Sequence, residues 1–245
     1  MSDSYAARLE RVVELVARDT DAARLDASDR RTLGELWRHR ATAEITAARM
    51  FEGLARDCSS HDVPAAVTEL IERAIGDERY HSELSARVAE LYLGERLAAP
   101  TPFADALRFE SCEAELALGL RLLLHCALNE SVSVAYLTEC HREAVSPLMR
   151  AATRELLRDE IDHARVGWAY LAAQRFASSA NERFCRELPA LITLVTNAWW
   201  KPATEMSYPV GHGVLSLERT REVAQDALQT LALPGLASLG IRTQP

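Results

Sequence analysis

Two pentapeptides, DERYH at residues 77–81 and DEIDH at residues 159–163, repeat one pattern at two distant places in the chain. In each, a glutamate stands three residues before a histidine and an aspartate directly precedes the glutamate. Residues three apart share a face of an α-helix, so each pentapeptide can direct a carboxylate oxygen and an imidazole nitrogen at one point. This is metal-ligand spacing. One such pair is weak evidence, but two pairs in the middle of long amphipathic helices are hard to attribute to chance.

The residues around both pentapeptides predict an all-α protein. Hydrophobic residues make up 48% of the 245, glycine and proline together number only 19, and alternating strand-like runs are scarce. The expected helices cover residues 5–25, 28–56, 64–93, 104–144, 147–176, 181–200 and 217–233. Ser28 is the expected cap of the second helix, and the fourth is open to a break near residue 111 or 119.

These helices arrange themselves as two hairpins. The CSSHD turn at residues 58–62 joins the first pair, and Gly94 ends the second helix of that pair. After a crossover at residues 95–103, Ser146 and Pro147 open the return helix of the second pair. We expect a ferritin-like four-helix bundle at about residues 28–176, with an N-terminal helix before it and a helical extension at about 177–245. The whole chain, 1–245, is expected to be a single domain.

Composition excludes several functions. The net charge is −8, so the chain has no basic footprint for nucleic acid or an anionic membrane surface. No signal peptide and no run of about 18 apolar residues is present, which predicts a soluble cytoplasmic protein that does not enter a membrane. The five cysteines form no CxxC pair, so neither a disulfide framework nor a rubredoxin-type knuckle is indicated.

A two-metal carboxylate site in a helical bundle takes one more glutamate from each of two other helices. In an antiparallel hairpin, two residues at the same height are equidistant from the turn, so the midpoint of their numbers falls on that turn. For Glu44 and Glu78 the midpoint is residue 61, inside CSSHD. For Glu130 and Glu160 it is 145, beside the Ser146–Pro147 helix start.

Helical phase supports the same two glutamates. Glu52 is a rival to Glu44 as the partner of Glu78. The midpoint of Glu52 and Glu78 falls just past the turn, so height alone does not exclude Glu52, but Glu52 lies on another side of its helix. Glu44 falls on an apolar stripe, and so does Glu130. The first stripe contains Trp37, Ala41, Ala48 and Phe51, and the second contains Leu116, Leu120, Leu123, Ala127, Val134 and Leu137. A carboxylate on such a stripe is costly to bury unless it is paired or binds a metal.

Each of these residues alone also fits a simpler interpretation. A single buried glutamate is often paired with an arginine, and a lone histidine on a core face is often a satisfied core residue. Four glutamates at one level with two histidines would make a poor core without cations between them. The set therefore favours a metal site more strongly than its members do.

The pattern Glu44, Glu78-x-x-His81, Glu130 and Glu160-x-x-His163 resembles the ligand set of the ferritin-like di-iron carboxylate proteins. This superfamily includes ferritins, rubrerythrins, bacterial multicomponent monooxygenases and p-aminobenzoate N-oxygenase. The resemblance implies that two glutamates, 78 and 160, bridge two irons. It also implies that Glu44 with His81 completes one iron and Glu130 with His163 the other.

The same resemblance extends to the preceding aspartates. Asp77 and Asp159 are similar to the monooxygenase residues that each bond the histidine of the opposite helix. A ligand histidine usually donates its second N–H to a carboxylate, which fixes the ring. The amine-oxygenating branch is expected to carry a further histidine at the position of Leu156, and this chain departs from it there.

By that resemblance the chain is an oxidoreductase, a di-iron oxidase or oxygenase. Two iron ions, with manganese as an alternative, would activate O2 to oxidise a small organic substrate. Electrons would come from a reductase or from the substrate. The sequence is also compatible with a homodimer. The alternatives are a ferroxidase or iron-storage protein, a rubrerythrin-like peroxide scavenger, and a metal-free helical interaction module. The C-terminal extension favours the enzyme, with Trp199, Trp200 and His212 as candidate wall residues.

Overall fold

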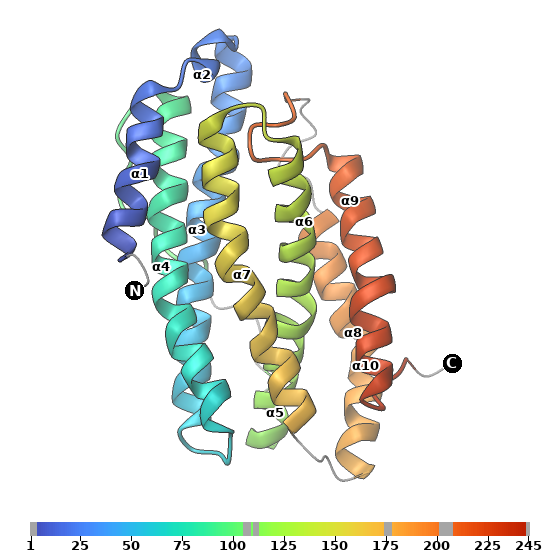
Figure 1. The fold of residues 1–245 in the computed structure, drawn as a ribbon. Helices are drawn as coiled ribbons and strands as arrows, with labels where there is room; N and C mark the ends of the chain where they lie inside the picture. The colour runs from blue at the N-terminus through green and yellow to red at the C-terminus, as the bar shows by residue number, and fades with distance from the viewer. Residues whose placement is uncertain (1–3, 105–108, 110–112, 174–177, 201–207, 244–245) are drawn as a thin grey trace.

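The structure, a computed structural model, describes residues 4–104, 109, 113–173, 178–200 and 208–243. In these residues it contains helices and no β-strand, which confirms the all-α prediction. The elements are α1 (Tyr5–Arg18), α2 (Asp21–Arg24), α3 (Ala27–Cys58), α4 (Ala65–Leu93), α5 (Ala114–Arg121), the π-helix η1 (Leu122–Asn129), α6 (Glu130–Glu143), α7 (Pro147–Ala173), α8 (Ser178–Trp200), α9 (Leu217–Asp226), the π-helix η2 (Ala227–Ala232) and α10 (Leu233–Ser238). Figure 1 shows α3, α4, α6 and α7 side by side, with α1 on one flank and α8, α9 and α10 on the other.

The first hairpin consists of α3 and α4. The expectation that Ser28 caps α3 is wrong, because the Asp26 side chain accepts the amide of Asp29 at 2.8 Å and the helix begins at Ala27. Aspartate at this position also faces the positive end of the helix dipole. The end of α4 is as expected: Gly94 takes the left-handed conformation at φ 74° and its amide bonds the Glu90 carbonyl.

The second hairpin consists of α5, η1 and α6, returning through α7. The first expected break, near residue 111, lies outside the described residues. The other, at Gly119, is wrong, because that glycine lies within α5, against the Phe184 ring of α8. The irregularity comes a few residues later, where η1 replaces α-helical bonding; the amide of Glu130 bonds the carbonyl of His125, five residues back.

The N-terminal segment is shorter and more interrupted than the expected helix over residues 5–25. The side chain of Asp19 accepts the amides of Asp21 and Ala22 at 3.0 and 2.9 Å, which ends α1 and starts the short α2. Aspartate commonly offers the backbone such an alternative to helical bonding. The resulting α1 packs against α4 and α7.

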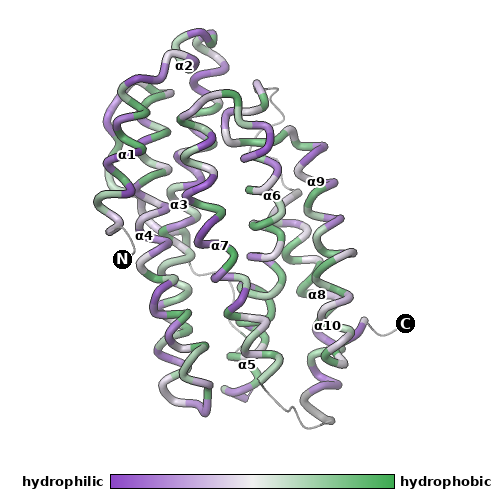
Figure 2. The backbone as a smooth tube through the Cα atoms, viewed as in Figure 1, coloured by the Kyte–Doolittle hydropathy of each residue, from purple (hydrophilic) through white to green (hydrophobic). Residues whose placement is uncertain are grey.

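The C-terminal helices share a core with the bundle. The cluster around Phe51 and Leu123 continues through Phe184 of α8 to Leu236 of α10, and all four side chains are fully buried. The helix expected over residues 217–233 is longer than predicted, running through α9, η2 and α10 to Ser238. In Figure 2 the long helices alternate hydrophilic and hydrophobic residues along their length, as amphipathic helices do. No helix in the described part of the chain is both long and apolar enough to span a membrane.

Candidate metal centre

All eight predicted site residues lie in described helices that face one another in the bundle. Glu44 comes from α3, Asp77, Glu78 and His81 from α4, Glu130 from the first position of α6, and Asp159, Glu160 and His163 from α7. Each helical hairpin thus contributes one lone glutamate and one Glu-x-x-His pair. The structure brings all of them to the same level, because both hairpins place their members at equal distances from their turns.

Two carboxylates, Glu78 and Glu160, lie between the two histidines. The oxygens of Glu78 are 3.2 Å from His163 Nδ1 and 3.6 Å from His81 Nδ1. Those of Glu160 are 3.4 Å from His81 Nδ1 and 3.3 Å from His163 Nδ1. Each glutamate therefore presents one oxygen to each histidine, the arrangement expected of a carboxylate that bridges two cations. All four residues are at most 2% exposed.

Glu44 completes one half of this arrangement. Ligand atoms of Glu44, Glu78, His81 and Glu160 all lie within 4.8 Å of one another. Glu52, which height alone left open, instead forms an ion pair with the exposed Arg79. The phase of α3 therefore separates the two candidates as expected, with Glu44 inside the bundle and Glu52 at its surface. Glu44 is half-buried, whereas the other five residues of the set are buried.

Glu130 completes the other half. Its side chain is buried beside Glu160, and it interacts electrostatically with Glu160, Glu78 and His163. Burial, followed by the charges of Glu160 and Glu78, raises the pKa of Glu130 well above its usual range. Charge interactions place Glu130 near Glu160, Glu78 and His163, whereas the group of ligand atoms within 4.8 Å of one another consists of Glu44, Glu78, His81 and Glu160.

The two aspartates contact the histidines in the crossed arrangement that the resemblance implies. Asp77 Oδ2 of α4 is 3.4 Å from His163 Nε2 of α7, and Asp159 Oδ2 of α7 is 3.2 Å from His81 Nε2 of α4. Each ring therefore has its outer nitrogen held by a carboxylate and its inner nitrogen, Nδ1, directed at the glutamates.

The electrostatics of the cluster are strongly perturbed. Burial, with the charges of Glu78 and Glu160, raises the pKa of Glu44 well above its usual range. Burial alone would lower the pKa of both histidines, but the surrounding carboxylates raise it: Asp159, Glu160 and Glu78 act on His81 in that order, while Glu78 and Glu160 act most strongly on His163. Burial would raise the pKa of Glu160, yet the adjacent His163 and His81 lower it. The pKa values of both histidines and of the two outer glutamates are raised, so each of these groups holds its proton more strongly than it would in water.

The donor atoms fit a pair of divalent cations. Four buried atoms of the cluster have no hydrogen-bond partner, and they are Glu78 Oε2, Glu160 Oε2, His81 Nδ1 and His163 Nδ1. A buried polar atom without a partner costs about 1–3 kcal/mol, so four together need an explanation. All four face the space between the glutamates and histidines, where cations would satisfy them. Carboxylate oxygens and imidazole nitrogens suit first-row metals such as iron or manganese.

Sequence reasoning missed the contribution of α1. Tyr5 donates to Asp77 Oδ1 at 2.8 Å, and Arg8 donates to both Asp159 and Glu155. Arg8 is only 2% exposed although it carries a charge. A signal was present, because Arg8 lies one turn before the buried Val12 on the inward face of an amphipathic helix. An arginine on an apolar stripe indicates a buried acidic partner, but the sequence does not say which one.

Gly167, Trp199 and His212 take part in helix packing or in hydrogen bonds within the protein. A side chain at Gly167 would lie 2.4 Å from the Ala127 amide, so this glycine lets α7 approach η1 closely. Trp199 donates to the Asn129 side chain, and His212 contacts the hydroxyl of Tyr92. The side chain of Trp200 lies outside the described residues. The small residues Ala41, Ala48 and Ala127 are likewise fully buried in helix interfaces.

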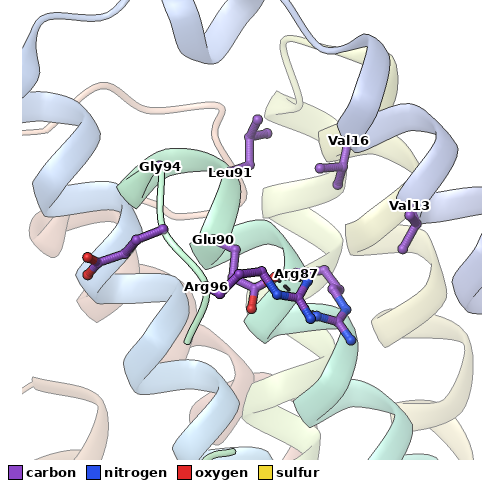
Figure 3. A pocket seen from close by; sticks show the side chains of 8 residues that line it. Val13, Val16, Arg87, Glu90, Leu91, Gly94 and Arg96 are labelled. Atoms are coloured by element: carbon purple, nitrogen blue, oxygen red, sulfur yellow. Dashed lines mark hydrogen bonds and ion pairs between the residues drawn. The ribbon is translucent and has the colours of Figure 1, made fainter. Parts of the chain in front are cut away.

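Two surface grooves are found between α1 and α4. Figure 3 shows the smaller, of about 320 Å³, where Arg87 and Arg96 both pair with Glu90. The larger, of about 900 Å³, runs beside Tyr5 and Tyr80. Neither is lined by any of the six proposed metal ligands.

The four cysteines in the described part of the chain, Cys58, Cys126, Cys140 and Cys185, are free thiols. Cys126 lies one turn before Glu130, and burial raises its pKa well above the usual range, with the Glu130 charge adding to the effect. A buried neutral thiol of this kind acts as a small packing residue.

The chain matches no model of a known protein family, no curated protein and no solved structure. What the structure shows is an all-helical protein with a buried cluster of carboxylates and histidines that can hold metal. Membership of the di-iron superfamily is therefore a proposal, supported by the ligand pattern.

Proposed function

We propose that this protein is a non-haem di-iron oxidase or oxygenase that uses O2 to oxidise a small organic substrate. The observation that carries the proposal is the symmetry of the cluster: Glu78 and Glu160 each present one oxygen to each histidine, and the inner nitrogens of both rings have no hydrogen-bond partner. These carboxylate and imidazole atoms lie within ion-pair distance of one another, yet four of them form no hydrogen bond, and they converge on a shared space.

The residues of the chain divide the task of holding two irons. Glu78 and Glu160 would bridge the two ions, Glu44 with His81 would complete one, and Glu130 with His163 would complete the other. Bound iron would supply the redox chemistry that O2 activation requires, with electrons from a reductase or from the substrate.

The surrounding side chains hold the ligands and exclude water. Asp77 and Asp159 hold the outer ring nitrogens, so neither imidazole is free to turn away from the centre. The Phe51 ring packs on His163 at a centroid distance of 5.4 Å and closes that side with an apolar surface. Because Glu44 is the half-buried member of the set, the approach for O2 and substrate is proposed to lie along α3.

The test is the metal content of protein purified without chelator, combined with its optical spectrum after anaerobic iron loading and exposure to air. We expect about two irons per chain and a transient visible absorption band. Glu44→Ala and Glu130→Ala should each lose about one iron. Glu52→Ala, a glutamate of the same helix as Glu44 but paired at the surface, should keep both irons.

The outcomes separate the alternatives. Iron that accumulates far beyond two per chain in a many-subunit cage would replace the oxygenase proposal with iron storage. Rapid peroxide consumption without substrate oxidation would favour a scavenger. If neither iron nor manganese binds stoichiometrically, the cluster is a structural element of a helical interaction module and the enzymatic proposal fails.

A further inference from the structure

The helix α1 lies outside the four-helix bundle, yet two of its side chains reach the aspartates that hold the ligand histidines. Tyr5 bonds Asp77 on α4, and Arg8, one turn later, bonds Asp159 on α7. Both contacts are made across more than 70 positions of sequence. The two aspartates therefore have partners on both sides, a histidine toward the centre and a residue of α1 on the outside.

Arg8 makes the stronger of the two contacts. Its Nε donates to Glu155 Oε2 at 2.6 Å, its Nη2 donates to Asp159 Oδ2, and its guanidinium lies 4.3 Å from the centre of the Tyr80 ring. Two carboxylates and an aromatic face thus fix one planar cation in a single orientation. The same oxygen, Asp159 Oδ2, also contacts His81 Nε2. A single carboxylate oxygen therefore connects Arg8 to a proposed metal ligand.

Two neighbours on α4, Tyr80 and Gly76, shape the position of the Tyr5 side chain. Its ring stacks on Tyr80 at 5.5 Å, and a side chain at Gly76 would lie 2.9 Å from the Tyr5 hydroxyl. The hydroxyl reaches Asp77 Oδ1, which leaves Oδ2 facing His163. The absence of a side chain at position 76 is therefore what lets the phenol approach the aspartate.

We propose that Tyr5 and Arg8 are positioning residues of the metal centre, each acting on one of its two halves. Tyr5 holds Asp77 and, through it, His163, while Arg8 holds Asp159 and, through it, His81. This inference rests on the proposed two-metal site. It assigns to α1 the role of fixing both ligand rings from outside the bundle.

The arrangement makes the two metal positions inequivalent. Asp77 receives a hydrogen bond from a neutral phenol, whereas Asp159 receives one from a cation that also holds Glu155. Loss of Tyr5 should affect the position that contains His163, and loss of Arg8 the position that contains His81. Global destabilisation would affect both positions together, which gives the proposal a selective readout.

The experiment is a cobalt(II) titration of the full-length protein, followed by the visible spectrum and by competition with a chelator. We expect Tyr5→Phe and Arg8→Met each to weaken one of two sites by about 10-fold, the low end of the effect for groups that orient a metal ligand, and to leave the other site within about 2-fold. Gly76→Ala should reproduce the Tyr5→Phe effect, and the two together should be no worse than either alone, because both break the same contact.

Glu130→Ala provides a crossed test, since it removes the metal position on the His163 side. In that background Arg8→Met should still weaken the remaining site, whereas Tyr5→Phe should have no effect. Arg8→Lys, which keeps the charge, should restore part of the affinity and of the wild-type spectrum. The controls are Arg18→Met, an exposed arginine of the same helix, and Tyr92→Phe, a buried tyrosine bonded to His212.

Urea unfolding of each metal-free variant shows that it is folded before cobalt is added. If the wild type binds two cobalt ions and Tyr5→Phe and Arg8→Met change neither affinity nor spectrum, the positioning role is wrong and the metal site stands. If both variants weaken both sites equally, α1 has a purely structural role. If the wild type binds no cobalt, iron or manganese, the proposed function itself fails, and the inference with it.

Discussion

At the scale of single residues, Glu44 illustrates the conflict between binding metal and folding without it. Its carboxyl lies beside Glu78 and Glu160, and burial together with those charges raises its pKa well above the ordinary value of 4.5. The folded, metal-free protein therefore holds a proton on Glu44 more strongly than the unfolded chain does. This costs free energy at every pH above the unfolded pKa, and metal removes the conflict by replacing the proton.

We therefore predict that Glu44→Gln stabilises the metal-free protein and weakens metal binding. Glutamine needs no proton, so the free energy of unfolding at pH 7 should rise by about 1 kcal/mol, and the gain should vanish near pH 4. Urea denaturation at both pH values measures this. Glu52→Gln, which breaks only an exposed ion pair with Arg79, should change the free energy of unfolding by less than about 0.5 kcal/mol. An equal response of the two variants would contradict the burial of the Glu44 charge.

At the scale of helices, η1 explains how the second hairpin delivers Glu130. π-Helical turns are frequent at functional sites, and this one ends directly before that glutamate. Three consecutive residues at the start of η1, Leu122, Leu123 and Leu124, are all apolar and buried, so they show no helical period. A continuous apolar run hides a change of helical period, which is why α-helical phase located Glu130 but not the π-helix before it.

The close contact of η1 with α7 predicts a sensitive position. In Gly167→Ala the new methyl group would lie 2.4 Å from the backbone amide of Ala127, so the two helices must separate. We expect a loss of about 2 kcal/mol in the free energy of unfolding and weaker metal binding, because Glu130 directly follows η1 and His163 lies on α7. Thermal unfolding and cobalt affinity report the two effects.

Gly53→Ala is the matched control on α3. There the new methyl group would crowd only the end of the flexible Arg121 side chain, which can move aside, and would make an ordinary contact with Arg56. Alanine also favours the helix, so this variant should be neutral or slightly stabilised. A Gly167→Ala protein as stable as Gly53→Ala would mean that the α7–η1 contact does not hold the centre together.

At the scale of the molecule, the loop before α9 joins both hairpins at one end of the bundle. The carbonyl of His212 accepts from Trp37 of α3, its ring lies 2.8 Å from the Tyr92 hydroxyl of α4, and Gly211 accepts the amide of Val145 between α6 and α7. A side chain at Gly213 would collide with the Trp37 ring at 2.3 Å. The C-terminal extension is thereby fastened to the bundle end by buried hydrogen bonds.

This contact predicts a pH-dependent contribution to stability. Burial lowers the pKa of His212, against the opposing charges of Asp19, Asp21 and Asp29, so the folded protein holds the ring neutral. The contribution is present above the unfolded pKa of about 6.5 and is lost as pH falls, because the unfolded chain then takes up the proton more readily. His212→Gln should thus lose more stability relative to wild type at pH 7 than at pH 5. An equal loss of stability at pH 7 and pH 5 would contradict the burial of a neutral His212 ring.

Local spacing was enough to predict the helical hairpins and the convergence of the six candidate ligands, because residue numbers fix height and phase within a helix. Hairpin turns at residue 61 and near residue 145 placed Glu44 and Glu130 beside their partners without any tertiary information. The metal and reaction remain a proposal, since the same ligand types serve several chemistries.

Only the tertiary structure showed which residues hold the two aspartates from outside the bundle. Tyr5 and Arg8 meet their aspartates across 72 and 151 positions, and no periodicity within a helix records such a contact. Period and turn length determine what lies on one helical face, whereas the packing of separate helices determines which faces meet.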